Sequence, residues 1–188
     1  MSEAQFEPLW VFGYGSLIWN PGFPVAQTAH ARLIGWRRSF CMSSIHHRGT
    51  PEAPGLVLAL DQAENAHCDG VAFRVTDGHE SATLEYLRER ELVSSAYLET
   101  RQTVHLSVGG TLENVLTFVI DPDHCQYRGD LDLETQAQII ARAVGGRGPN
   151  DEYLINTAEH LHQIGVPDAE LSWLQSRVAE IKAEIKPS

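Results

Sequence analysis

A glycine-rich turn near the start of the chain is the segment best suited to hold a ligand. The apolar run at residues 9–11 predicts a strand, and two glycines around an aromatic residue follow it. Because glycine leaves backbone amides accessible, such a turn favours an anion, either a carboxylate or a phosphate. A Gly-X-Gly sequence after a strand is also often a simple bend. The turn lies in the stretch of residues 12–21, which contains Gly13, Gly15 and Ser16.

A glutamate far along the chain is the candidate proton acceptor. Glu91 follows Leu84 and Leu87 at helical spacing, so the three share one helix face and Glu91 projects from its apolar side. Glu89 points elsewhere. A carboxylate directed inward at a helix end is a candidate general base with a raised pKa. The alternative is a solvated glutamate in a helix end rich in charge.

Other polar residues give weaker indications. Arg48, in a polar loop, either helps to hold a substrate carboxylate or forms an ion pair within the loop. Tyr153 is either a core aromatic or a phenolic donor that faces the site. Ser16 does not stand in a Gly-X-Ser-X-Gly elbow, which argues against a serine hydrolase. His46 and His47 are adjacent and would point to opposite faces of a strand, so we expect no metal site.

The bulk properties exclude several classes of protein. The chain has 188 residues and a net charge of −11, which argues against binding to nucleic acid or to an anionic membrane. The length predicts one domain over residues 1–188. Three cysteines without metal-ligand spacing favour a reducing compartment. With no signal-peptide pattern and no membrane-spanning run, we expect a cytoplasmic protein.

The predicted elements form an α+β fold with a helical C-terminal third. Strands are predicted at residues 9–13, 32–42, 56–60, 71–75, 97–106 and 114–120. Asp77 and Glu80 have capping-box spacing and predict the start of the internal helix. After Asp130 the pattern predicts three helices: one that runs to Val144, one N-capped by Asn150, and one at residues 171–185. About six strands of this kind are enough to curl into a barrel.

Six short motifs occur together in this chain. They lie at residues 11–21, 35–40, 48–55, 70–74, 86–91 and 148–154. Together they resemble the ChaC family of γ-glutamylcyclotransferases, and the resemblance spans about residues 9–165 in the family's order. Many relatives continue the motif around Glu91 with a Gly-Gly-Tyr run. Residues 92–97 depart from it and look like the bacterial branch of the family.

The resemblance implies a fold and an activity. It implies a small mixed or antiparallel β-barrel flanked by helices, and Glu91 as the catalytic base. It also implies that the turn at residues 11–17 holds the γ-glutamyl group, so that the substrate-binding residues are Val11, Phe12, Gly13, Tyr14, Gly15, Ser16 and Leu17. The implied reaction cleaves glutathione to 5-oxoproline and Cys-Gly without a cofactor. No obligate protein partner is evident from the sequence. Two alternatives remain: a cyclotransferase for other γ-glutamyl amino acids or amines, and a non-catalytic ligand-binding module.

Overall fold

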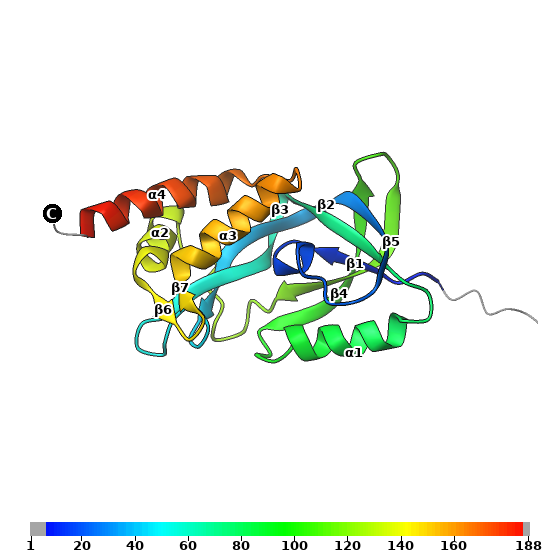
Figure 1. Ribbon diagram of the computed structural model, residues 1–188, viewed down its shortest axis with the longest axis horizontal. Helices are drawn as coiled ribbons and strands as arrows, with labels where there is room; N and C mark the ends of the chain where they lie inside the picture. Colours follow the sequence, from blue (N-terminus) through cyan, green and yellow to red (C-terminus); the bar gives the residue numbers. More distant parts are fainter. Residues whose placement is uncertain (1–6, 186–188) are drawn as a thin grey trace, which may run out of the picture. The chain divides into compact units, whose positions relative to one another are not determined.

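The computed structural model describes residues 7–185, and strands β1 to β5 form a closed barrel (Figure 1). The order around the barrel is β1-β3-β2-β4-β5. β1 runs antiparallel to β3, with Val11 opposite Phe73, and parallel to β5, with Val11 opposite Leu116. The barrel strands are β1 (Trp10–Gly13), β2 (Val25–Ser44), β3 (Gly55–Val75), β4 (Tyr97–Leu106) and β5 (Thr111–Ile120).

Four α-helices complete the described elements, together with one short 3₁₀ helix and a two-stranded ribbon. The helices are α1 (Glu80–Glu91), α2 (Leu133–Arg142), α3 (Asn150–Gln163) and α4 (Ala169–Ile185); the short elements are η1 (Ser16–Ile18), β6 (Val144–Gly145) and β7 (Gly148–Pro149). No helix among the described residues is both long and apolar enough to cross a membrane. The expected α+β fold with a small barrel and a helical C-terminal third is confirmed.

The chain divides into two compact units, and β2 and β3 contribute residues to both. The first unit contains the chain up to Arg37 together with Gln62–Val119, and the second contains Arg38–Asp61 together with the chain from Ile120 onward. In the first, the buried apolar residues of the strands include Val11, Phe12, Leu33, Val104 and Leu116. Whether the two units act as the one domain expected for residues 1–188 stays a prediction.

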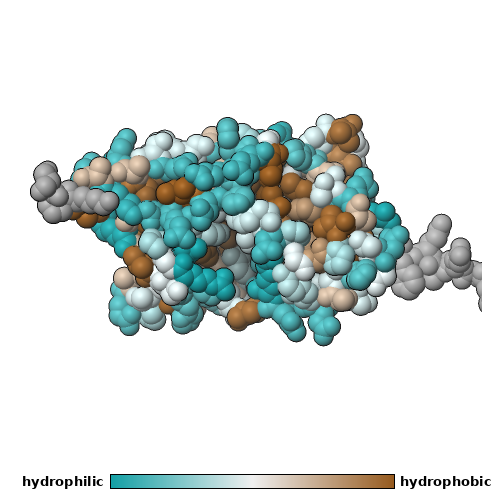
Figure 2. Space-filling view, in the orientation of Figure 1, coloured by the Kyte–Doolittle hydropathy of each residue, from teal (hydrophilic) through white to brown (hydrophobic). Residues whose placement is uncertain are grey.

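In the second unit, α4 packs against α2 and α3 (Figure 1). The apolar stripe predicted for the last helix is buried, at Leu171, Leu174, Val178 and Ile181. The face of the molecule drawn in Figure 2 is mainly hydrophilic, with the hydrophobic residues in separate small groups.

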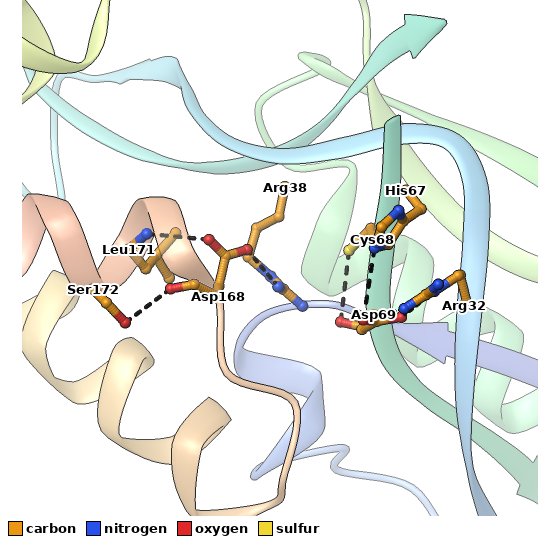
Figure 3. Close-up of polar contacts among 8 residues, drawn as sticks. All are labelled: Arg32, Arg38, His67, Cys68, Asp69, Asp168, Leu171 and Ser172. Atoms are coloured by element: carbon orange, nitrogen blue, oxygen red, sulfur yellow. Dashed lines mark hydrogen bonds and ion pairs between the residues drawn. The ribbon is translucent and has the colours of Figure 1, made fainter. Parts of the chain in front are cut away.

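Figure 3 shows two arginine–aspartate pairs, which differ in exposure. In the first unit, Arg32 donates to both carboxylate oxygens of Asp69, at 2.7 and 3.0 Å, near the surface. In the second unit, the buried Arg38 donates to Asp168 at 2.9 Å. Asp168 also accepts from the backbone N–H of Leu171, so its carboxylate holds both Arg38 and the first turn of α4.

Three predictions about element boundaries are wrong. The separate strands at residues 56–60 and 71–75 are one strand, β3, because the polar residues between them remain in the sheet with mostly exposed side chains. No capping box forms, since Asp77 accepts from Arg74 at 2.7 Å and α1 begins only at Glu80. The helix expected to reach Val144 ends at Arg142, because Val144 pairs with Pro149 in the ribbon.

The predicted N-cap of α3 is also wrong. Pro149 occupies the N-cap position and Asn150 is the first residue of the helix. The Asn150 side chain does not cap the helix, because its amide is bonded to the backbone of Leu56 in β3.

Candidate active site

The glycine-rich turn begins where β1 ends and is closely packed on one side. Gly13 and Gly15 are buried, and the N–H of Ile18 donates to the carbonyl of Gly15 at 2.9 Å. A Cβ on Gly13 would lie 3.1 Å from the ring of Phe73, whereas a Cβ on Gly15 would meet nothing within 4 Å. The backbone at Gly15 therefore has free space beside it, as ligand binding by the turn requires.

Residues of the predicted ligand-binding run differ in exposure. Val11, Phe12, Tyr14 and Leu17 are buried, and Ser16 is exposed at the start of η1. The hydroxyl of Thr117, on β5, donates to the carbonyl of Phe12 at 3.3 Å and so fixes the strand that leads into the turn. Ser16 is thus the one of these side chains that can reach solvent from the turn.

Glu91 is the last residue of α1, and its side chain is mostly buried. It is 18% exposed, whereas Glu89 is an exposed residue of the same helix. Leu87, one turn earlier, is fully buried as the predicted helix face requires, whereas Leu84 is only partly buried. Burial raises the pKa of the Glu91 carboxyl above its ordinary value, and the neighbouring Arg90 guanidinium acts in the opposite direction. The side chain is therefore not a solvated surface glutamate, and its role as a base stays a prediction.

Arg90 connects the glutamate to the turn, a role that the sequence analysis missed. Its Nε lies 3.3 Å from Glu91 Oε1, and its Nη2 donates to Ser16 Oγ at 2.9 Å. Its Nη1 donates to the carbonyl of Asn20 and to the Tyr86 hydroxyl. The one available signal was the spacing of Tyr86 and Arg90, which puts both on the same helix face next to Glu91.

Arg48 and Tyr153 lie together in the second unit. The Arg48 guanidinium stands 5.7 Å from the centre of the Tyr153 ring and donates to the carbonyl of Pro149 at 3.1 Å. Its ion pair with Glu152 is longer, at 3.8 Å. The Tyr153 hydroxyl accepts from the N–H of Leu58 at 3.4 Å. These contacts fit a structural role for both side chains, and their contact with a substrate stays a prediction.

Metal-ligating side chains are dispersed in the described part of the chain. His46 and His47 are both exposed, and no three His, Cys, Asp or Glu side chains among the residues described are grouped so that they could hold a metal ion. The cysteines Cys41, Cys68 and Cys125 are free thiols. The turn and Glu91 thus remain the chemical candidates.

Comparisons with known proteins agree with the motifs. The chain matches the model of the family described as ChaC-like protein over residues 9–181. The glutathione-specific γ-glutamylcyclotransferase of Escherichia coli is 36% identical to it, over 96% of this chain and 77% of that protein. γ-Glutamylcyclotransferase 2-3 of Arabidopsis thaliana is 35% identical, over 94% of this chain and 91% of that protein.

A solved structure supports the fold. The crystal structure of a yeast γ-glutamylcyclotransferase specific to glutathione superimposes with a TM-score of 0.83. The match covers 97% of this chain and all of that one, at 23% identity, and so it bears on the fold. The resemblance inferred from the motifs is confirmed.

Proposed function

This chain belongs to the ChaC-like protein family, and we propose that it is a glutathione-specific γ-glutamylcyclotransferase. The observation that carries the proposal is the set of relatives named for this activity, from a bacterium, a fission yeast and animals. These relatives are 31–36% identical to the chain over most of its length.

The reaction is an internal attack within the substrate. The α-amine of the γ-glutamyl residue forms a bond to its own γ-carbonyl carbon, and the bond from that carbon to the cysteine nitrogen breaks. The five-membered ring becomes 5-oxoproline, and Cys-Gly leaves with a proton on its new amine. Because no water is consumed, the enzyme is a lyase and no hydrolase.

Glu91 is the base of the proposed mechanism. At neutral pH the substrate amine is mostly an unreactive ammonium, so a nearby carboxylate must take a proton before the ring can close. A buried carboxylate with a raised pKa is a stronger base than a solvated one, and burial raises the pKa of Glu91. The same carboxyl can then return the proton to the departing amine of Cys-Gly.

The turn at residues 11–17 binds and orients the γ-glutamyl group in this proposal. Ring closure requires the amine to face the carbonyl carbon, and holding the substrate in that conformation lowers the barrier. Backbone amides beside Gly15 are suited to donate to the substrate carboxylate or to the oxyanion that forms during attack. Ser16 is a binding residue here, because the attacking group belongs to the substrate.

Incubation with glutathione tests the substrate. We expect equal amounts of 5-oxoproline and Cys-Gly, and no turnover of γ-glutamyl-alanine. The reverse preference would favour the cyclotransferase for other γ-glutamyl compounds, and no turnover of either would favour the ligand-binding module.

Substitution of the base tests the mechanism. We expect Glu91→Gln to reduce kcat at least about 100-fold, the usual scale for loss of a general base. Glu89→Gln is the matched control, because it makes the same change at an exposed position of the same helix. A Glu91→Gln enzyme with the wild-type rate would show that another group accepts the proton.

We also propose a cytoplasmic location and a reaction without a cofactor. Glutathione is a thiol, and the free cysteines of the chain suit a compartment that keeps thiols reduced. Cell fractionation tests the location. Dialysis against a chelator tests the second point, and we expect the rate to be unchanged.

A further inference from the structure

All three nitrogens of the Arg90 guanidinium make polar contacts, although its side chain is 21% exposed. Nε lies 3.3 Å from Glu91 Oε1, and Nη2 donates to Ser16 Oγ at 2.9 Å. Nη1 donates to the carbonyl of Asn20 at 2.7 Å and to the Tyr86 hydroxyl at 3.1 Å. One side chain thus contacts the carboxylate, the turn and the segment after the turn, all within the first unit.

The segment after the turn is fitted closely to the same helix face. Gly22 has a positive φ of 76°, and a Cβ there would lie 2.0 Å from the Tyr86 hydroxyl. Tyr86 and Arg90 are one helical turn apart on α1, so they present a continuous surface to this segment. Arg90 supplies the polar contacts on that surface and Tyr86 supplies the packing against Gly22.

We propose that Arg90 is a positioning residue: it ties Ser16 and Asn20 to α1 and holds the Glu91 carboxylate in one place relative to the turn. This proposal rests on the proposed function, in which the turn holds the γ-glutamyl group and Glu91 takes the proton. Arg90 thus links the turn that binds the substrate to the carboxylate that accepts its proton.

The contact geometry requires arginine in particular. A planar guanidinium has donors that diverge in fixed directions, and here they reach a carboxylate, a hydroxyl and a carbonyl at once. A lysine ammonium is a compact point charge and cannot reach all three groups. Arg90→Lys therefore keeps the positive charge but loses the connection, whereas Arg90→Met loses both.

The charge of Arg90 has a second, separable effect. Among the described residues, Arg90 is the charged group that lowers the pKa of Glu91, against the effect of burial. The other titratable side chain in this cluster is the Tyr86 hydroxyl, which accepts from Arg90. Removal of the charge raises the pKa of Glu91 further, so more of the carboxyl is protonated at a given pH.

Steady-state kinetics on three variants tests the proposal. We expect Arg90→Lys to lower kcat by about 100-fold, the scale for a small misplacement of reacting groups, with a smaller change in KM. Its acid limb of kcat/KM stays near the wild-type pH. Arg90→Met loses at least as much kcat, and its acid limb moves to higher pH. Arg88→Lys makes the same change at an exposed residue of α1 that pairs with Glu99, and it should keep the wild-type rate.

A second measurement does not depend on turnover. Carboxyl ¹³C resonances of glutamate-labelled protein, with Glu91 assigned by its loss in Glu91→Gln, report the pKa of Glu91 in each variant. We expect a higher pKa in Arg90→Met than in Arg90→Lys or the wild type. A wild-type protein inactive on glutathione would defeat the proposed function, while this titration would still test Arg90. A folded Arg90→Lys or Arg90→Met protein with wild-type kcat would overturn the positioning role, whatever the pKa of Glu91.

Discussion

The buried amide of Asn150 offers a sharp test of how the second unit is held together. Its Oδ1 accepts from the N–H of Leu56 at 2.7 Å, and its Nδ2 donates to the carbonyl of Leu56 at 2.8 Å. Asn150 has no exposed surface and Leu56 is 2% exposed. Asn150→Ala therefore leaves one backbone donor and one backbone acceptor of β3 buried without a partner.

The size of the effect follows from those two groups. A buried polar group without a partner costs about 1–3 kcal/mol, so the two groups left by Asn150→Ala should lower the free energy of unfolding by about 2–6 kcal/mol. For a chain of this length, that corresponds to a fall in Tm on the order of 5–20 °C. Gly55 is adjacent, and a Cβ there would lie 2.6 Å from Asn150 Oδ1, so the site has no room to rearrange in that direction.

Urea denaturation followed by circular dichroism measures the change. Asn156→Ala is the matched control, because Asn156 is an exposed residue of α3, and it should change stability by less than about 0.5 kcal/mol. Asn150→Asp separates the two bonds. Its carboxylate still accepts from the N–H of Leu56 but is repelled by the carbonyl oxygen of Leu56. This variant should therefore be less stable at pH 7 than at pH 4, where the protonated acid can donate to that carbonyl. A loss below about 1 kcal/mol for Asn150→Ala would refute the reasoning.

Three further results are expected. Burial raises the pKa of Glu91 above its ordinary value of 4.5, so the wild type loses stability as the pH rises from 4.5 through the raised pKa; Glu91→Gln escapes this loss. The difference in urea midpoint between Glu91→Gln and the wild type should therefore increase as the pH rises from 4.5 through the raised pKa. A difference that does not change with pH would contradict this prediction. Arg38→Met breaks a buried ion pair and should cost about 3–5 kcal/mol, whereas Arg32→Met at the exposed pair should cost less than about 1 kcal/mol; equal costs in thermal unfolding would count against this. Gly70→Ala places a Cβ 2.3 Å from the carbonyl of Gly13, so we expect a lower Tm and a raised KM for glutathione, and wild-type values of both would be inconsistent with the packing.

The sequence predicted those features that depend on neighbours along the chain. The helix face of Glu91 follows from the spacing of Leu84 and Leu87, and the strand at β1 follows from a local apolar run. The turn was recognisable because its glycines and its serine are consecutive. Patterns of this kind need only the period of a helix or a strand.

The features that the sequence did not predict depend on partners far away in the chain. Asp77 has the spacing of a cap but is bonded to Arg74, and Asn150 resembles a cap but is bonded to Leu56 in another element. Arg90 contacts Ser16 and Asn20, which are about 70 residues away in sequence. A local sequence pattern cannot predict a contact between residues so far apart in the chain. Side chains of this type have several possible partners, and only the fold selects one of them.

The division of β2 and β3 between the two units has a consequence for synthesis on the ribosome. Each unit is assembled from two separate stretches of chain, and the stretch Arg38–Asp61 belongs with residues that begin only at Ile120. The barrel can therefore close before the helices of the second unit exist, while the buried groups of Leu56 await Asn150. At about 5–20 residues per second, that interval lasts several seconds. A nascent chain arrested before α3 emerges would then lack Asn150 and Tyr153, the side-chain partners of the Leu56 and Leu58 backbone in β3.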